Sequence, residues 1–292
     1  MKRIAFILNP VSGTKQKRRL PLLIRRYFSY AQGYVVAFYR TKCAGDATVV
    51  AKRFVAEGYD VVVAIGGDGT VNEVAQALAG SGAALGIVPI GSGNGLARHL
   101  HIPMRPRRAL KFIREAQARQ VDYGLINGTP FFCTAGVGFD ALIGNRFAQA
   151  GSRGVGTYVR KILREYIFYK PSYYDLTIDG ATIRRKAFLI TFANASQWGN
   201  NAYIAPAASI SDGMLDVVVL SEFPLYKTPE VGLQLFTKRI DKLRYVEIFK
   251  CRSAVVRCAR ESYVHFDGEP AQANSCVEVQ LVHRALSVLM NE

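Results

Sequence analysis

The segment from Asp60 to Glu73 holds the residues of this chain that are best suited to chemistry. A fully apolar run leads into Gly66-Gly67-Asp68-Gly69-Thr70, and the pattern then becomes helical. Glycines let the backbone approach a phosphate chain closely, and the amides of a helix start supply donors and positive potential. An acid beside such an anion repels it unless a metal ion or a proton transfer is involved. We therefore interpret Asp68 as a Mg²⁺-linked or catalytic carboxylate, and the pattern indicates a kinase.

The 292 residues are enough for two domains with cores of their own. No apolar run reaches the ~18 residues of a membrane span. The N-terminal apolar run ends at Asn9-Pro10, which favours a first strand over a signal peptide. The five cysteines form no C-x-x-C pair, which fits a reducing cytoplasm and argues against disulfides or a zinc site.

The chain carries 38 basic and 22 acidic side chains, and its net charge of +16 favours anionic partners. No RNP sequence, zinc-finger spacing or helix-turn-helix pattern accompanies this charge, so we expect no nucleic-acid partner. An anionic membrane surface is the better interpretation. Ordinary solvated faces are the alternative, and composition leaves it open.

The first third of the chain alternates strand and helix patterns. The expected strands are Ile4–Leu8, Tyr34–Arg40, Asp60–Ile65 and Ala84–Pro89. Helices are expected in the Lys15–Tyr30 region, over Asp46–Ala56 and over Val71–Ala79. This rhythm predicts a parallel sheet with helices on both faces, whose ligand lies beyond the carboxyl ends of the strands. Three glycine-containing loops fall there: Asn9–Gly13, Gly66–Thr70 and Gly91–Gly95.

After about Ala118, short alternating stretches separated by turn residues predict an antiparallel β domain. The expected strands are Gln120–Ile126, Phe131–Thr134, Tyr174–Ile178, Lys186–Phe192, Leu215–Leu220, Tyr245–Phe249, Ala254–Arg257 and Cys276–Val282. Helical insertions are expected near 153–169 and 227–243. We therefore divide the chain into residues 1–125 and 126–292, with the last strand able to return to the first domain.

Six short motifs follow one another in a specific order and spacing. They are Asn9–Gly13, Thr41 with Gly45-Asp46-Ala47, Gly66–Thr70, Gly91–Asn94, Asp212–Asp216 and Phe266–Pro270. Each alone is weak, but together they resemble the diacylglycerol kinase catalytic-domain family, which includes bacterial lipid kinases and sphingosine kinases. The resemblance covers nearly the whole chain.

The resemblance implies an α/β nucleotide-binding domain, a C-terminal antiparallel β-sandwich and a cleft between them. ATP would lie against Gly66–Asn72, with Thr41 and Ser92 nearby, and a lipid alcohol would enter from the second domain. The nucleotide-binding residues expected on this basis are Asn9, Thr41, Gly66, Gly67, Asp68, Gly69, Thr70, Asn72, Ser92, Gly93 and Asn94.

Phosphoryl transfer requires a carboxylate that takes the proton of the acceptor hydroxyl and Mg²⁺ that neutralises the phosphate oxygens. By resemblance, bacterial members use the acid of the Asp-Gly-Glu motif, and sphingosine kinases emphasise the acid of the glycine loop. We expect Glu269 to be the base, with Asp68 and Asp267 organising Mg²⁺ and water. The alternative for Asp267–Pro270 is a plain hairpin turn.

A second, structural Mg²⁺ site is also implied by the resemblance to bacterial members. Its ligands would be the Asp212 carboxylate and the backbone carbonyls of Ser209 and Met214, hard oxygen donors that suit Mg²⁺. An Asp-Gly turn without a metal is the alternative.

The segment Val155–Lys170 fits an amphipathic helix with tyrosines on its apolar stripe and basic residues off it. Such a helix could rest on an anionic membrane, or it could dock on the protein's own core. We expect a cytoplasmic protein that binds peripherally to the inner membrane face, and a homodimer is possible.

One departure from the bacterial pattern affects the acceptor. Many bacterial members have Asp directly after the Asn of the third loop, whereas Gly95 follows Asn94 here. The acceptor is therefore open between diacylglycerol, a sphingoid base and another lipid alcohol. NAD kinase and a non-catalytic nucleotide- or lipid-binding protein remain as alternatives.

Overall fold

The computed structural model describes residues 1–13, 19–142, 169–258, 262–273 and 275–291. Contacts between residues divide the chain into two units: unit 1 is Met1–Tyr123 with His283–Glu292, and unit 2 is Gly124–Val282. The expected helix over Val155–Lys170 lies almost entirely outside the described residues. Within the described part of the chain, no helix has both the length and the hydrophobicity that crossing a bilayer requires.

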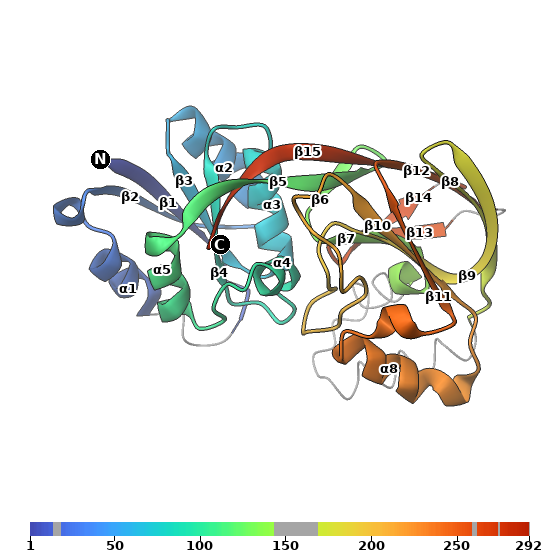
Figure 1. The fold of residues 1–292 in the computed structure, drawn as a ribbon. Coiled ribbons are helices and arrows are strands. Elements are labelled where there is room, and N and C mark those ends of the chain that lie inside the picture. The colour runs from blue at the N-terminus through green and yellow to red at the C-terminus, as the bar shows by residue number, and fades with distance from the viewer. Residues whose placement is uncertain (14–18, 143–168, 259–261, 274, 292) are drawn as a thin grey trace. The chain divides into compact units, whose positions relative to one another are not determined.

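Unit 1 contains a parallel sheet in the order β15-β4-β3-β1-β2 (Figure 1). Its strands are β1 (Lys2–Leu8), β2 (Tyr34–Arg40), β3 (Val61–Gly66), β4 (Ala84–Pro89) and the end of β15 (Cys276–Met290). Every residue of β3 and β4 is buried, because helices cover both faces of the sheet. The predicted parallel α/β domain is confirmed.

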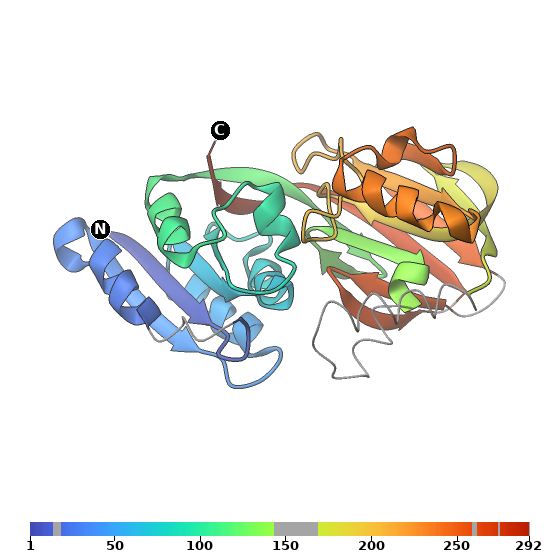
Figure 2. The same cartoon turned by 90° about the horizontal axis from the view of Figure 1, so that it is seen from below.

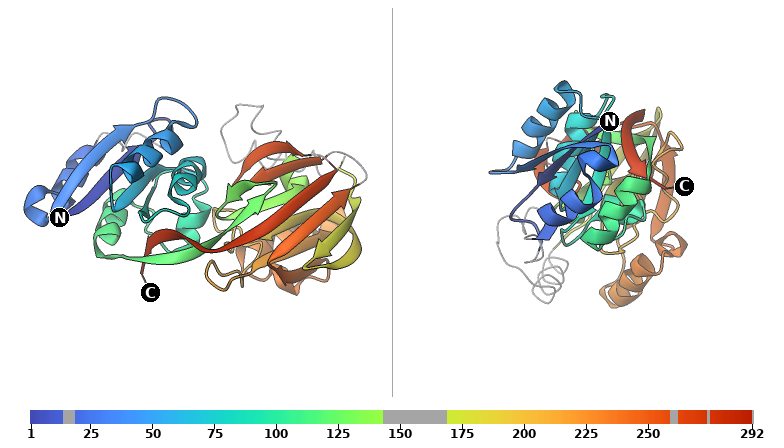
Figure 3. Two further views of the ribbon diagram at one scale, coloured as in Figure 1. Left: turned by 90° about the horizontal axis from the view of Figure 1, so that it is seen from above. Right: turned by 90° about the vertical axis from the view of Figure 1, so that its left-hand side faces the viewer.

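Two pairs of helices cover this sheet. On one face lie α1 (Leu20–Tyr27) and α5 (Pro106–Glu115), and on the other α2 (Asp46–Ala56) and α3 (Asp68–Leu78), as Figures 1 and 3 show. The short helices η2 (Tyr30–Gln32) and α4 (Gly95–His99) lie in connections. The α1 helix ends earlier than predicted because Phe28 takes an extended backbone. The α3 helix begins earlier than predicted, with Asp68 in its first turn, where a negative charge is favourable.

Unit 2 is the predicted antiparallel β-sandwich (Figures 1 and 2). Its strands are β5 (Gln117–Ile126), which begins in unit 1, β6 (Thr129–Phe131), β7 (Thr134–Gly138), β8 (Ser172–Ile178), β9 (Ala181–Ala193), β10 (Leu215–Ser221), β11 (Val246–Cys251), β12 (Ser253–Cys258), β13 (Ser262–Phe266), β14 (Glu269–Ala273) and the first part of β15. The long β9 pairs first with β8 and then with β7 and β10, so it joins the two layers.

Several details of unit 2 differ from expectation, and β9, for example, begins at Ala181 rather than at the predicted Lys186. The predicted strand Phe131–Thr134 is split, because the chain leaves β6 and starts β7 within it. The hairpin of β13 and β14 was not predicted as strands. The helical insertion near 227–243 has three pieces: η3 (Leu225–Lys227), α8 (Thr228–Phe236) and η4 (Ile240–Lys242). The α8 and η4 pieces pack on β9 and β10 through a cluster that includes Phe188, Leu220 and Ile240.

Candidate functional site

Hydrogen bonds join the three glycine loops at the carboxyl edge of the unit 1 sheet. The Asn9 amide, after β1, donates to the Ile65 carbonyl at 3.0 Å. The amides of Ile90 and Gly91, after β4, both donate to the Gly66 carbonyl, at 2.9 and 3.2 Å. Backbone groups at the ends of neighbouring strands thus continue to pair beyond the sheet. The loops form one continuous surface.

The first loop contacts the second through side chains. Asn9 Nδ2 donates to Thr70 Oγ1 at 3.0 Å, and Asn9 Oδ1 accepts the Val11 amide at 2.9 Å. Thr70 is buried in the first turn of α3. The Thr41 amide donates to the Leu8 carbonyl at 2.9 Å, which brings the end of β2 to the same edge. Asn9, Thr70 and Thr41 thus hold the loops together through hydrogen bonds within the protein.

The second and third loops approach so closely that glycine is required at their contact. A Cβ added to Gly67 would lie 3.2 Å from the Gly91 Cα, and one added to Gly91 would overlap the Gly67 backbone. Gly91 therefore admits no side chain, and at Gly67 a side chain fits only if the Gly91 backbone shifts by a few tenths of an ångström. The sequence suggested that these glycines serve phosphate approach, and the structure adds that they let two loops touch.

Asp68 fastens the third loop to the start of α3. Its Oδ2 accepts the Asn94 amide at 2.8 Å and its Oδ1 accepts the Gly95 amide at 2.7 Å. Burial raises the pKa of Asp68, and the two amides oppose this rise. Each carboxylate oxygen can accept a further bond, so the Asp68 carboxylate keeps capacity for a cation or a water molecule.

Asn94 has a left-handed backbone, with φ of 53°, and its side chain closes the third loop. Its Oδ1 accepts the Gly91 amide at 3.0 Å, and its Nδ2 donates to the Gly91 carbonyl at 2.8 Å. Arg98 Nε donates to the Gly93 carbonyl at 3.0 Å. Ser92, at the tip of this loop, is exposed and available to a ligand.

Glu73 of α3 orders the loop that carries Thr41, a role that was not predicted from the sequence. The Glu73 carboxylate accepts the amides of Gly45 and Ala47, both at 3.0 Å, at the start of α2. Thr48 Oγ1 donates to the Glu73 carbonyl at 2.9 Å. The helix-start signal at Gly45-Asp46 was visible in the sequence, but its partner on α3 was not.

In unit 2, Asp267 and Gly268 form the two-residue turn between β13 and β14. Their φ values are 48° and 86°, and Phe266 pairs with Glu269 across the turn. The Asp267 carboxylate accepts the amides of Phe132, Cys133 and Thr134 at 2.9, 2.7 and 3.1 Å. The motif is therefore a hairpin whose acid anchors it to the junction of β6 and β7.

Glu269 follows this turn as the first residue of β14, and it is exposed. The anchored turn fixes the position of its backbone. A carboxylate held on a rigid hairpin and open to solvent can reach a proton of a bound molecule. Asp267 and Glu269 thus differ in surroundings: the first carboxylate accepts three protein amides, and the second is accessible.

A largely buried polar cluster, made by His265 of β13, Thr191 of β9 and Asp140 just after β7, was not predicted from the sequence. His265 Nε2 and Thr191 Oγ1 both lie 3.0 Å from Asp140 Oδ2. Gly136, between them on β7, leaves the space that the carboxylate fills, since a Cβ there would lie 2.8 Å from Asp140 Oδ2. The three residues are far apart in the sequence, so no local pattern announces the cluster.

The loop expected to hold a second Mg²⁺ carries a lysine at its carboxylate. Lys250 Nζ lies 2.7 Å from Asp212 Oδ2 and 3.2 Å from Oδ2 of the buried Asp216. The Met214 amide donates to Asp212 Oδ1 at 3.1 Å. Burial raises the pKa of Asp216, and the Lys250 ammonium opposes this rise. Among the described residues, no group of three or more His, Cys, Asp and Glu is placed to hold a metal. The Asp212 site stays a prediction, and the Lys250 ammonium would compete with an ion for the Asp212 carboxylate.

Comparison with known proteins assigns both units. The family described as diacylglycerol kinase catalytic domain matches residues 3–126, and the YegS C-terminal NAD kinase beta sandwich-like domain matches residues 133–290. A diacylglycerol kinase of Staphylococcus aureus (strain bovine RF122 / ET3-1) is 31% identical over 276 residues, covering 92% of this chain and 86% of its own. The diacylglycerol kinase of Bacillus subtilis (strain 168) is 28% identical over 284 residues, with coverages of 92% and 90%.

A solved structure shows the same fold. The crystal structure of a diacylglycerol kinase from Bacillus anthracis str. Sterne superposes with a TM-score of 0.75 at 22% identity, covering 99% of this chain and 97% of that one. The predicted resemblance is confirmed by these matches. The chain belongs to the diacylglycerol kinase catalytic-domain family and is an enzyme, a lipid kinase.

Proposed function

We propose that the chain transfers the γ-phosphate of ATP to the hydroxyl of a lipid such as diacylglycerol, in a Mg²⁺-dependent reaction. The observation that carries the proposal is the closure of three glycine loops around the start of α3, at the carboxyl edge of a parallel sheet. Ligands of such sheets bind at this edge. Curated relatives named diacylglycerol kinase support the choice of acceptor.

The nucleotide phosphates would lie against the second loop. Amides at the start of the eleven-residue α3 point beyond its N-terminus and carry positive potential. Gly66, Gly67 and Gly69 present backbone rather than side chain there, and the exposed Ser92 offers a hydroxyl from the third loop. Asn9, Thr41, Thr70, Asn72, Gly93 and Asn94 complete the proposed nucleotide-binding set.

Mg²⁺, when bound, neutralises phosphate oxygens and so assists departure of the transferred group. Asp68 fits this role, because each of its oxygens accepts one amide and keeps a lone pair. Asp267 is the weaker candidate, because its carboxylate already accepts three amides. We therefore assign cation and water placement chiefly to Asp68, with Asp267 positioning the hairpin.

We assign the general base to Glu269. As the acceptor oxygen bonds to the γ-phosphorus, the bond from that phosphorus to the β,γ-bridging oxygen breaks. The hydroxyl proton passes to a Glu269 Oε atom, and the products are ADP and the phosphorylated lipid. The exposed Glu269 carboxylate on its anchored hairpin is suited to this proton transfer.

The substitution Glu269→Gln tests this assignment. It preserves shape and removes the basic oxygen, so turnover should fall by about 10²–10⁴-fold while ATP binding persists. Glu278→Gln, at another exposed glutamate of unit 2, is the matched control and should retain turnover. Wild-type turnover in Glu269→Gln would remove Glu269 from the mechanism.

Other acceptors remain within this proposal. A sphingoid base or another lipid alcohol presents the same kind of hydroxyl, and the proposed chemistry covers each of these lipid acceptors. A lipid acceptor further implies peripheral action at an anionic membrane, which we place at the inner, cytoplasmic face.

A further inference from the structure

The helical insertion of unit 2 exposes large apolar side chains. Leu225 and Tyr226 of η3 are 52% and 75% exposed, and Leu233 and Phe236 of α8 are each 60% exposed. Single exposed apolar residues are common on the surfaces of soluble proteins, whereas a patch of several such residues marks an interaction site. Four such residues within twelve positions of the chain form a group.

The geometry of α8 places its exposed apolar residues on one side. Leu233 and Phe236 are three residues apart, and the exposed Pro229 precedes Leu233 by four, so the three share a helix face. Val231 is buried and Leu235 packs against the core of unit 2, so they occupy the inner face. The α8 helix is thus apolar on both faces, whereas a surface helix normally turns polar residues to solvent.

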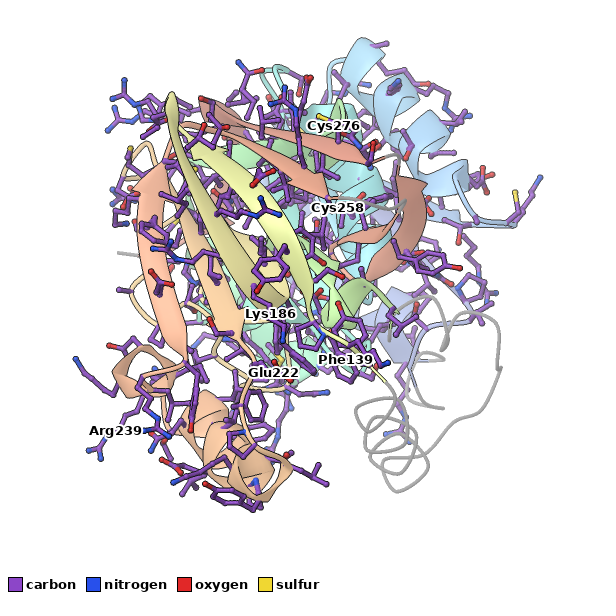
Figure 4. The ribbon with its side chains drawn as sticks, turned by 90° about the vertical axis from the view of Figure 1, so that its right-hand side faces the viewer. Phe139, Lys186, Glu222, Arg239, Cys258 and Cys276 are labelled. Carbon is purple, nitrogen blue, oxygen red and sulfur yellow. The ribbon has the colours of Figure 1, made fainter. Side chains whose placement is uncertain are left out.

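Cations are frequent in the same segment of the chain. Residues 224–245 contain Lys227, Lys238, Arg239, Lys242 and Arg244 against the acids Glu230 and Asp241. Lys227 pairs with Glu230 at 2.6 Å and Lys242 with Asp241 at 3.2 Å. Within the described residues, Lys238, Arg239 and Arg244 form no salt bridge, and the exposed Arg239 lies at the outer surface beside α8 (Figure 4).

A pocket adjoins the apolar residues of η3. It has a volume of about 370 Å³ and is lined by Lys227, Glu230, Lys242, Leu243, Arg244 and Tyr245. Arg244 interacts electrostatically with Tyr226, so the pocket and the exposed tyrosine are neighbours. Of the three lining cations, Lys227 is paired with Glu230 and Lys242 with Asp241. Arg244 forms no salt bridge within the described residues, so it is the cation of this pocket best suited to a headgroup phosphate.

We propose that the α8 face, defined as Leu225, Tyr226, Leu233 and Phe236 with Lys238, Arg239 and Arg244, docks on a bilayer of anionic phospholipid. The apolar side chains enter the boundary of the acyl chains, and the cations contact headgroup phosphates. The inference rests on the proposed lipid-kinase function, because its acceptor is found in a bilayer. It is independent of Val155–Lys170.

Charge favours a membrane over a second copy of the chain. Two α8 faces brought together around a two-fold axis would place the same excess of positive charge opposite itself. An anionic bilayer instead offers negative charge at its headgroups for the cations and an apolar interior for the exposed apolar side chains. A dimer through this face is therefore an outcome of the test rather than the proposal.

Flotation of the full chain with vesicles tests the proposal. Vesicles of phosphatidylcholine with phosphatidylglycerol are compared with vesicles of phosphatidylcholine alone. We expect binding to the anionic vesicles, a several-fold loss of the bound fraction in Leu233→Ser/Phe236→Ser, and weaker salt dependence in Lys238→Gln/Arg239→Gln. Leu22→Ser/Val49→Ser, at equally exposed apolar residues of unit 1 helices, should bind like wild type.

Three results would overturn the proposal. The first is unchanged vesicle binding in both α8-face variants, and the second is an equal loss of binding in the control variant. The third is a wild-type dimer that Leu233→Ser/Phe236→Ser dissociates without affecting vesicle binding.

Phosphate transfer to a lipid dispersed in detergent is measured in parallel. If binding falls in the variants but wild type transfers no phosphate to lipid, the kinase proposal fails and the docking surface stands. If transfer occurs and binding does not change, the docking surface alone fails.

Discussion

Asp68 Oδ2 accepts the backbone amide of Asn94 at 2.8 Å, so the acid of the second glycine loop holds the third. Asp68 Oδ1 accepts the next amide, that of Gly95, at 2.7 Å. The same carboxylate is our candidate for placing Mg²⁺. Asp68 therefore holds the two loops together and is also the proposed Mg²⁺ ligand. A substitution at Asp68 should change both the free energy of unfolding and the turnover.

Asp68→Asn should destabilise the protein and lower turnover. The amide nitrogen of Asn would face one of the two backbone donors, leaving that pair unsatisfied at a cost of roughly 1–3 kcal/mol. Because burial raises the pKa of Asp68, its carboxyl contributes stability that is present at low pH and lost as the pH rises through the folded-state pKa. Urea unfolding at a series of pH values should show a larger decline in wild type than in Asp68→Asn. An Asp68→Asn variant as stable as wild type would contradict the fastening role.

Asp267→Asn should lower the free energy of unfolding by about 1–3 kcal/mol, because at least one of three amides loses its acceptor. Glu269→Gln, at an exposed side chain two residues away, should stay within about 0.5 kcal/mol of wild type. Thermal unfolding of the two variants provides the comparison. Equal losses of stability would mean that the two acids do not have the separate roles we assign.

Lys250→Met should destabilise unit 2, because the buried Asp216 would lose its cationic partner, with a loss of roughly 1–3 kcal/mol. If Asp212 is a metal ligand, removal of the ammonium should let Mg²⁺ stabilise the variant more than wild type. Melting temperatures with Mg²⁺ and with a chelator measure this difference. Identical melting under both conditions in both proteins would count against a metal at Asp212.

The native His99 side chain should cause the free energy of unfolding to fall on acidification. Burial lowers the pKa of His99 to about 4, and the charge of His101 adds to the shift. The unfolded chain has the ordinary histidine pKa of about 6.5 and takes up the proton first. The free energy of unfolding is therefore highest above pH 6.5 as far as His99 is concerned. It should fall by up to roughly 3 kcal/mol as the pH is lowered towards 4. In His99→Gln this loss should be smaller, and in His101→Gln, at an exposed neighbour, it should persist.

Local patterns predicted the elements whose residues repeat regularly. The β2, α2 and β4 ranges agree with expectation residue for residue, because each is a periodic or fully apolar run bounded by turn residues. The three glycine loops were placed correctly at one edge, because parallel strands share their direction. Strands β13 and β14 were missed, since they are short and contain Pro270 and polar residues.

The contacts that define the site could not be predicted, because they join distant residues. Asp267 accepts amides about 135 positions away, and the Asp140–His265 contact spans 125 positions. The motif Asp267–Pro270 indicated acids near an acceptor but not that one of them anchors the hairpin. Lys250 lies on β11, and nothing in the Asp212 loop announces it. The residue types were therefore enough to predict phosphoryl-transfer chemistry, but only the fold shows which carboxylates remain accessible to a ligand.

The most direct test is transfer of labelled phosphate from ATP with Mg²⁺ to a panel of diacylglycerol, sphingosine, phosphatidylglycerol and NAD. If the chain phosphorylates a lipid, the labelled product is soluble in chloroform, and it names the class of lipid acceptor. A labelled product from NAD alone, in the aqueous phase, would contradict the proposed transfer to a lipid.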